Sequence, residues 1–163
     1  MIIKMLQERF NSIEVLEMAK DIEKRGLEFY QFQAQGTDNQ EIEELFLKLA
    51  GDEQDHYERF EELEQAVRDK TGEEAEYVYD AEVSVYLNSL VEFSVFPAEA
   101  EVEENFAGSQ EVIEMAIRAE KDSILFYSEM LPYNKENTKN VLNQLIKEEK
   151  QHLLDLMKLR SGL

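Results

Sequence analysis

The sequence predicts an all-α fold: a four-helix bundle built from two repeated helix pairs with one long crossover connection. Three observations support this prediction. Helix-forming Glu, Leu, Lys and Ala are abundant, whereas the 163 residues include only two prolines and six glycines. The second half of the chain repeats the first, and apolar residues in both halves recur at helical spacing. We expect one domain, residues 1–163, because this length suits a single hydrophobic core.

Caps and breakers bound the four expected helices. Asn11 followed by Glu14 resembles a capping box, which would start the first helix. Ser109 is a suitable N-cap for the third helix, and Pro132 would end it. The expected helices cover about residues 13–34, 40–69, 109–131 and 138–159. They form a first helix pair within residues 11–70 and a second within residues 109–160.

The segment between the two pairs, residues 71–108, mixes aromatic residues, Val and acidic residues. A structureless loop of this length would be unusual in a compact domain. We therefore expect a crossover that contains a short helix near residues 80–90. Alternating stretches such as "AEYVY" are also compatible with short strands, and periodicity alone does not decide between the two.

The internal repeat is visible by direct alignment. "EVLEMAKDIEKRGLEFY" (14–30) aligns with "EVIEMAIRAEKDSILFY" (111–127) at an offset of 97, with nine of 17 positions identical. "LFLKLAGDEQDH" aligns with "VLNQLIKEEKQH" at an offset of 96. One helix pair cannot bury its apolar stripe alone, so the repeat predicts that the two pairs pack against each other.

Composition excludes several classes of function. The 37 acidic residues outnumber the 17 Lys and Arg residues, which gives a formal net charge of −20. Such a surface repels nucleic acid and anionic membranes, so neither is an expected partner. The absence of cysteine excludes disulfides, Cys-ligated zinc, iron–sulfur clusters and thiol nucleophiles. The sequence shows neither a secretory signal nor a membrane span, so we expect a soluble, cytoplasmic protein.

Polar residues interrupt the apolar stripes at matched positions in the two repeats. Both histidines of the chain lie in the same Glu-x-x-His frame, as Glu53 with His56 and Glu149 with His152. Helical spacing places both pairs within apolar stripes, so they should point into the bundle. The other two helices each add one inward carboxylate. The sequence therefore predicts that six side chains converge in one core: Glu23, Glu53, His56, Glu120, Glu149 and His152.

Burying four ionised carboxylates costs several kcal/mol each unless cations compensate them. Two divalent ions balance four carboxylates in charge and also use the lone pairs of neutral imidazoles. Residues at i and i+3 lie on one face of a helix, about 4.5 Å apart along its axis, so one helix can present a bridging Glu and a terminal His. Oxygen-rich ligands with one nitrogen per metal suit iron or manganese.

This pattern resembles the rubrerythrin branch of the ferritin-like di-iron carboxylate proteins. The matching motifs are Glu23-x6-Tyr30, Glu53-x-x-His56, Glu120-x6-Tyr127 and Glu149-x-x-His152. The resemblance implies two iron ions, with Glu53 and Glu149 as bridging ligands. It also implies terminal ligands in the other four positions, namely Glu23, His56, Glu120 and His152. Tyr30 and Tyr127 would donate hydrogen bonds to ligand carboxylates.

Two features of the chain depart from the resembled family. Rubrerythrins usually carry a Cys-ligated rubredoxin iron, which a chain without cysteine cannot hold, so an external electron donor protein is implied. They also carry an additional Glu one turn after the third-helix ligand, where this chain has Ser123. The redox-linked iron movement of rubrerythrins is therefore not expected here.

Three functions remain open at this stage. The leading prediction is a di-iron oxidoreductase that reduces peroxide or dioxygen to water with electrons from a separate protein. The second is a ferroxidase or iron-handling protein, with which the acidic surface is compatible. The third is a metal-stabilised, non-catalytic binding module that docks a partner. The resemblance further implies a homodimer.

Overall fold

The structure is a computed structural model that describes residues 9–70, 78–93, 96 and 109–162. Within these residues the chain is helical, which confirms the predicted all-α class. The elements are α2 (Ser12–Gly36), α3 (Gln40–Asp69), α4 (Ala81–Phe93), α6 (Ser109–Met130), a 3-10 turn η1 (Leu131–Tyr133) and α7 (Glu136–Gly162).

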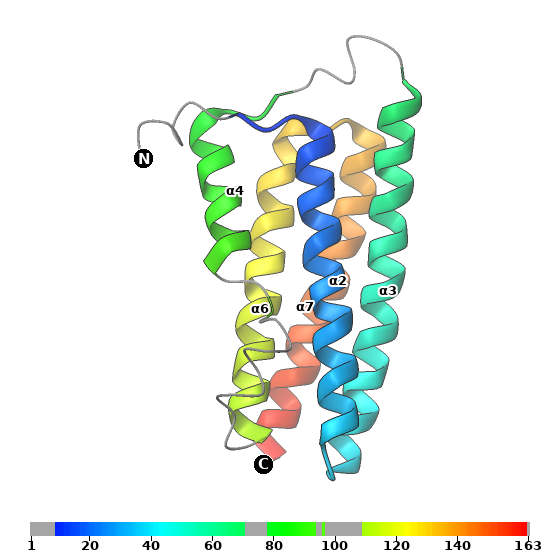
Figure 1. The fold of residues 1–163 in the computed structure, drawn as a ribbon, viewed down its shortest axis with the longest axis vertical. Coiled ribbons are helices and arrows are strands. Elements are labelled where there is room, and N and C mark those ends of the chain that lie inside the picture. The colour runs from blue at the N-terminus through cyan, green and yellow to red at the C-terminus, as the bar shows by residue number, and fades with distance from the viewer. Residues whose placement is uncertain (1–8, 71–77, 94–95, 97–108, 163) are drawn as a thin grey trace.

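Four long helices form the bundle (Figure 1). The helices of each pair are antiparallel neighbours: α2 lies beside α3, and α6 lies beside α7. The helix α3 ends at the top of the view and α6 begins at the bottom, so the connection between the pairs returns along the length of the bundle. This is the predicted arrangement of two helix pairs with one long crossover.

Local chemistry explains where the helices begin and end. The side chain of Asn11 accepts a hydrogen bond from the Glu14 amide, and the Glu14 carboxylate accepts one from the Asn11 amide, which confirms the predicted capping box. Asn39 caps α3 in a similar way through the Ile42 amide. The chain departs from α-helical geometry at Leu131, just before Pro132, as predicted. The predicted bounds therefore differ from the observed ones by at most three residues.

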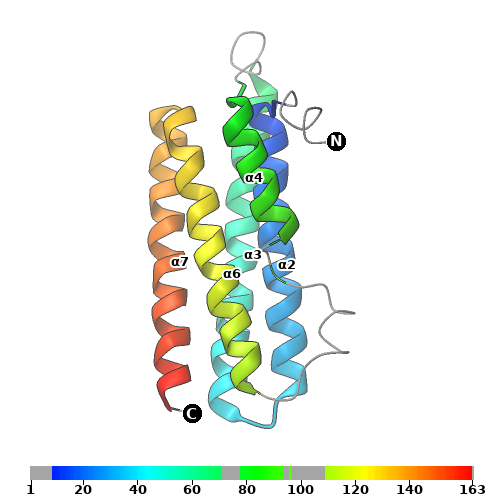
Figure 2. The same cartoon turned by 90° about the vertical axis from the view of Figure 1, so that its left-hand side faces the viewer.

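The described part of the crossover includes the expected short helix, α4, which begins one residue later and ends three residues later than predicted. It lies along the α2–α6 side of the bundle (Figure 2), where Leu87 and Leu90 join the core. Of the alternating stretch "AEYVY", residues 75–77 lie outside the described residues. Val78 forms a single antiparallel bridge with Asn11, so the described part of the stretch contributes no regular strand.

The apolar core consists of two clusters stacked along the bundle axis. One cluster surrounds Phe29, Phe46 and Leu156, and the other surrounds Phe60 and Phe126. Both clusters draw side chains from all four long helices, as expected for pairs that bury each other's stripes. The six Glu and His residues that the sequence predicts to converge lie between the two clusters, halfway along the bundle.

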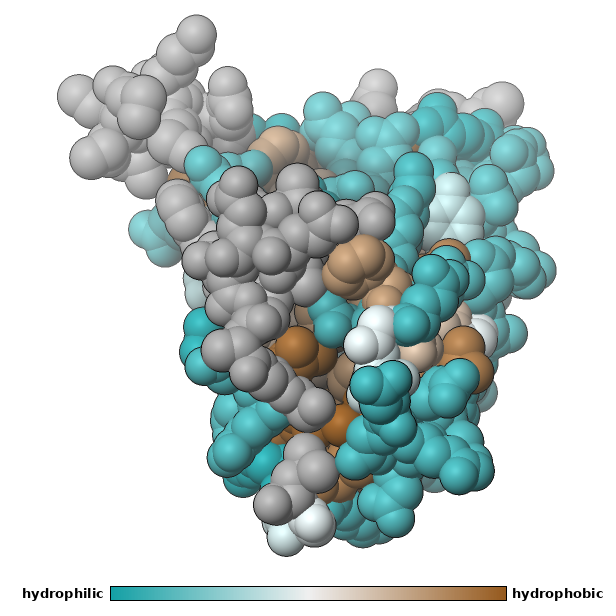
Figure 3. All heavy atoms as spheres, turned by 60° about the horizontal axis from the view of Figure 1, so that its bottom comes forward, coloured by the Kyte–Doolittle hydropathy of each residue, from teal (hydrophilic) through white to brown (hydrophobic). Residues whose placement is uncertain are grey.

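The described residues on the face in Figure 3, which includes the lower end of the bundle, are mostly hydrophilic, with apolar residues in groups near its middle. No helix in the described part of the chain combines the length and the apolar character that a membrane span requires.

Candidate metal centre

All six polar residues that the sequence predicts to converge lie in the interior of the bundle. Each is at most 2% exposed. Glu23 comes from α2 and Glu120 from α6, whereas α3 and α7 each contribute a Glu and a His one turn apart. They form two groups in which ligand atoms lie within 4.8 Å of one another. The groups are Glu23, Glu53, His56 and Glu149, and Glu53, Glu120, Glu149 and His152.

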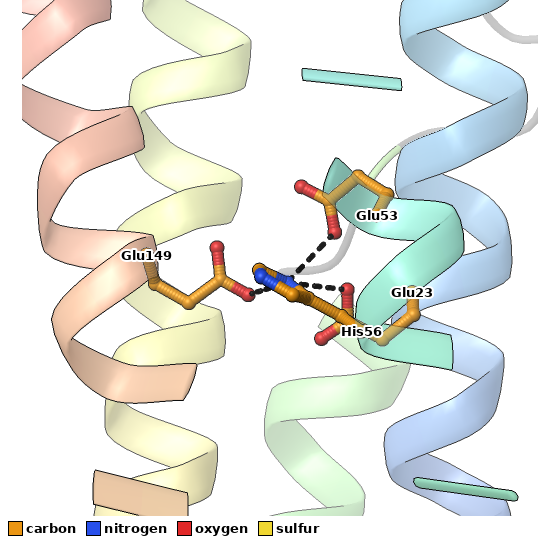
Figure 4. Close-up of side chains that lie close together, drawn as sticks. All are labelled: Glu23, Glu53, His56 and Glu149. Atoms are coloured by element: carbon orange, nitrogen blue, oxygen red, sulfur yellow. Dashed lines mark hydrogen bonds and ion pairs between the residues drawn. The ribbon is translucent and has the colours of Figure 1, made fainter. Parts of the chain in front are cut away.

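The first group surrounds the Nδ1 atom of His56. This atom lies 3.1 Å from Oε1 of Glu149, 3.4 Å from Oε2 of Glu23 and 3.8 Å from Oε2 of Glu53. Figure 4 shows the imidazole ring between the Glu149 carboxylate on one side and the carboxylates of Glu23 and Glu53 on the other. Three helices therefore direct oxygen atoms at one ring nitrogen.

The second group surrounds the Nδ1 atom of His152 in the same way. This atom lies 2.9 Å from Oε2 of Glu149, 3.5 Å from Oε1 of Glu53 and 3.8 Å from Oε1 of Glu120. The two imidazole rings stack with centroids 5.4 Å apart and planes 18° from parallel. Glu53 and Glu149 belong to both groups, and each directs one oxygen at each histidine. This sharing is the geometry that two bridging carboxylates require.

Two buried tyrosines contact the carboxylates that are not shared. The Tyr30 hydroxyl donates a hydrogen bond to Glu120, and the Tyr127 hydroxyl donates one to Glu23. Each bond joins one repeat to the other. Burial is the main cause that raises the pKa of both tyrosines well above the ordinary range, so both hydroxyls keep their protons and act as donors.

The outer nitrogens of the histidines contact two acidic residues that the sequence analysis did not single out. Nε2 of His56 lies 2.9 Å from Glu148, and Nε2 of His152 lies 3.2 Å from Asp52. A carboxylate on the far side of a histidine fixes its tautomer and directs the lone pair of the other nitrogen inward. The repeat held a signal for these residues, because Asp52 and Glu148 align at the offset of 96 and each precedes a predicted Glu ligand.

Burial and neighbouring charges shift the pKa values of Glu53, Glu120 and Glu149. Burial is the main cause that raises the pKa of Glu53 well above its ordinary range, and the charges of Glu149 and Glu23 add to it. Burial, with repulsion from Glu149, also raises the pKa of Glu120 to about 8. Without metal, burial and repulsion between carboxylates therefore favour the protonated forms of Glu53 and Glu120.

The histidines respond in the opposite sense to burial. Burial disfavours a charged ring at His56, but hydrogen bonds with Glu149 and Glu23 outweigh it and raise the pKa to about 11. The pKa of His152 is raised for the same reason. Burial also disfavours the charge on Glu149, yet its hydrogen bonds with the two histidines hold its pKa below the ordinary range. Protons on imidazole thus supply the positive charge that metal ions would otherwise supply.

Hydrogen bonding within the cluster is incomplete. The atoms left unpaired show whether these residues suit a metal. One oxygen of each of the four carboxylates is buried and forms no well-aligned hydrogen bond with the described residues, and neither does Nδ1 of His152, although it lies 2.9 Å from Oε2 of Glu149. Buried polar atoms without partners are rare, because each one costs about 1–3 kcal/mol. Divalent cations would satisfy these atoms, and the donor set of oxygens with one nitrogen per group suits iron or manganese. The residues present therefore fit a metal pair.

A glycine close to the cluster makes room for it. A Cβ atom on Gly26 would lie 3.0 Å from Phe96 and 3.2 Å from the Glu53 carboxyl carbon, closer than nine in ten real Cβ contacts. Phe96 belongs to the crossover, is 2% exposed and packs against Phe29 and Tyr30. A side chain at position 26 would therefore displace either the aromatic cover or a shared carboxylate. The sequence alone gave no signal for this close approach.

Comparison with known proteins agrees with this geometry. The family described as Rubrerythrin matches residues 14–160 of the chain. The chain belongs to the rubrerythrin family. A protein of Thermotoga maritima, described provisionally as a ferritin-like diiron-carboxylate protein, has a similar crystal structure with a TM-score of 0.75 and 24% sequence identity. The match covers 95% of this chain and 97% of that chain, and at this identity it shows the shared ferritin-like fold alone. No curated protein matches the chain.

One position distinguishes this member from the rubrerythrin pattern. Ser123, which stands where the additional Glu is expected, is 2% exposed, and its hydroxyl donates to the backbone carbonyl of Ala119 one turn earlier at 3.1 Å. It therefore contributes no carboxylate to the cluster. The repeat aligns Ser123 with Gly26, so both terminal carboxylates are followed one turn later by a small residue.

Proposed function

We propose that this member of the rubrerythrin family is a di-iron carboxylate oxidoreductase that reduces peroxide or dioxygen with electrons from a separate donor protein. One observation carries the proposal: two buried four-residue groups share Glu53 and Glu149. A pair of shared carboxylates keeps two metal ions within reach of one small oxidant. A single-metal site would not need two carboxylates that each face both histidines.

Each metal position would use residues from three of the four long helices. Glu23 and His56 would hold one ion, and Glu120 and His152 would hold the other, with Glu53 and Glu149 between them. Bound as the reduced pair, two irons would supply the two electrons that, together with two protons from solvent, convert one hydrogen peroxide to two waters. The four carboxylates neutralise two divalent ions, which removes the cost of burying uncompensated charge.

The protein's own groups would prepare the site for this chemistry. Tyr30 and Tyr127 donate to the terminal carboxylates and so fix which oxygen faces the metal. Asp52 and Glu148 hold the outer edges of the imidazoles. The apolar clusters above and below the site limit the access of water. Because the chain has no cysteine, it cannot carry a rubredoxin-type iron, and the electrons would come from another protein.

The experiment that tests this proposal measures both the oxidation of the bound iron and the consumption of the oxidant. Protein loaded with iron is reduced without oxygen, peroxide or air is added, and the absorbance of the iron and the consumption of oxidant are measured together. We expect oxidation of the iron pair with matched consumption of oxidant, and repeated turnover when a reductant is supplied. Glu53→Gln should abolish both signals, whereas Glu62→Gln, a change at an exposed carboxylate of the same helix, should change neither. Metal binding without any turnover would refute the enzyme and favour a metal-stabilised binding module.

A second function, iron oxidation for storage or sequestration, is favoured by Ser123. Without an additional carboxylate at this position, the ligand set is symmetric and carries no group specific to peroxide. Oxidation of several added Fe(II) ions per chain by dioxygen, together with a very large particle in light scattering, would support this function. A monomer or dimer that oxidises only two ions and needs a reductant to repeat would support the oxidoreductase.

A further inference from the structure

The two halves of the metal centre differ in what lies beyond the histidines. Behind His56, the Glu148 carboxylate is held by Arg59, whose guanidinium donates to both of its oxygens at 3.1 and 2.9 Å. The same guanidinium also pairs with Asp55 one turn earlier on α3. Glu148 is therefore fixed from two sides, by the imidazole and by a bidentate ion pair that resists rotation of the carboxylate.

The corresponding place behind His152 has no such pair. The side chains of Asp52 and Glu148 are equally exposed, at 42% and 41%, but within the described residues no Lys or Arg makes an ion pair with Asp52. The repeat aligns Arg59 with Asp155, which carries the opposite charge and pairs with Lys48 at 3.0 Å instead. Among the described residues, Nε2 of His152 therefore contacts only the carboxylate of Asp52, at 3.2 Å.

A ligand held in its binding orientation loses less conformational freedom when the metal arrives, so it binds more tightly. We propose that Arg59 is a positioning residue that makes the two metal positions unequal: the Glu23–His56 position binds a divalent ion first and more tightly, and the Glu120–His152 position binds second. This inference rests on the proposed two-metal centre. It adds an order of loading that the symmetric ligand set alone does not contain.

The charge of Arg59 acts in the opposite direction, because a cation near the site repels a metal ion. The guanidinium is about one quarter exposed and is already paired with two carboxylates, so solvent and its partners screen this repulsion. Orientation should therefore outweigh repulsion. The two effects predict opposite results when Arg59 is removed, which makes the inference testable.

The test measures Mn(II) binding to the full chain, cleared of metal, by calorimetry and by electron paramagnetic resonance. The wild type should bind two ions in separate steps, and at one ion per chain it should show mainly the signal of an isolated Mn(II). Arg59→Gln should weaken the tighter step about tenfold, the lower end of the range for residues that orient metal ligands. It should leave the weaker step unchanged, so that magnetically coupled pairs form already at one ion per chain.

Two further variants control and assign the steps. Lys48→Gln breaks the ion pair at the matched position of the other repeat and should change neither step. Asp52→Asn removes the charge behind His152 and should weaken the second step only. In each variant, an unchanged far-ultraviolet circular dichroism spectrum shows that the bundle is intact.

The outcomes separate this inference from the proposed function. If the wild type binds no Mn(II) and no Fe(II), both fail. If it binds two ions with equal affinity, or if Arg59→Gln tightens binding or weakens both steps alike, only the inequality fails and the two-metal centre stands. If Arg59→Gln weakens the first binding step alone and Lys48→Gln changes neither step, the assignment of Arg59 is supported.

Discussion

Replacing Glu53 by Gln should separate the metal-linked stability of the bundle from its stability without metal. Glu53 faces both histidines, so Gln at this position removes one ligand from each of the two groups. In the metal-free protein the raised pKa already favours a neutral Glu53, and a neutral Gln of similar shape replaces it. The free energy of unfolding without metal should therefore change by no more than about 1 kcal/mol, the size of one hydrogen bond.

The effect with metal should be much larger. At free metal 100 times the dissociation constant, each position adds about 2.7 kcal/mol of stability, or about 5 kcal/mol for two. In a protein of this size 1 kcal/mol shifts Tm by about 2–4 °C, so metal should raise the Tm of the wild type by about 10–20 °C. If the loss of Glu53 weakens each position about 100-fold, only about 0.4 kcal/mol per position remains, and the shift falls to about 2–3 °C.

Differential scanning calorimetry of chelator-treated protein, with and without excess Mn(II), measures both quantities. Glu23→Gln removes a ligand from one group only and should keep about half of the metal-induced shift. Glu62→Gln, at an exposed position of the same helix as Glu53, should keep all of it. A wild-type shift retained in Glu53→Gln would refute the assignment of Glu53 as a shared ligand.

Three further outcomes are expected. The pKa values of His56 (about 11) and Glu120 (about 8) lie above their unfolded values of 6.5 and 4.5, so the folded metal-free protein keeps protons that the unfolded chain releases. The Tm of the metal-free protein should therefore fall as the pH rises from about 6.5 to 9. A Tm that stays constant or rises over this pH range would contradict these pKa shifts. Gly26→Ala should lower the metal affinity, because the new methyl group presses on Glu53, even though Ala stabilises a helix by about 1 kcal/mol relative to Gly. Calorimetric titration with Mn(II) measures this affinity, and an unchanged affinity would contradict the prediction. Tyr127→Phe leaves a terminal carboxylate without its donor and should weaken one binding step about tenfold, and equal weakening of both steps would argue against a contact confined to one metal position.

The fold was predictable because its determinants are local or periodic. The capping box at Asn11 and the break before Pro132 act within one turn, and the apolar stripes need only helical geometry. The convergence of the six polar residues followed from the repeat, since matched positions in paired helices meet at matched heights. The crossover was harder, because periodicity does not separate short strands from a helix in a segment of mixed composition.

The parts of the site that escaped prediction depend on tertiary distances. Gly26 is one of six glycines, and only the approach of Phe96 and Glu53 to its Cα shows why this one has no side chain. Arg59 is one of many surface charges, and its contact with Glu148 joins residues 89 positions apart. Spacing along one helix cannot reveal such contacts, because they depend on how two helices from different repeats face each other.

The crossed tyrosine bonds carry a consequence for the origin of the chain. Tyr30 serves a carboxylate of the second repeat and Tyr127 one of the first, so neither helix pair contains a complete ligand shell. A half-length ancestor would have obtained its full set of donors only by associating with an identical copy. Duplication and fusion would then have made that association permanent and left the two copies free to diverge, as at the aligned positions of Arg59 and Asp155.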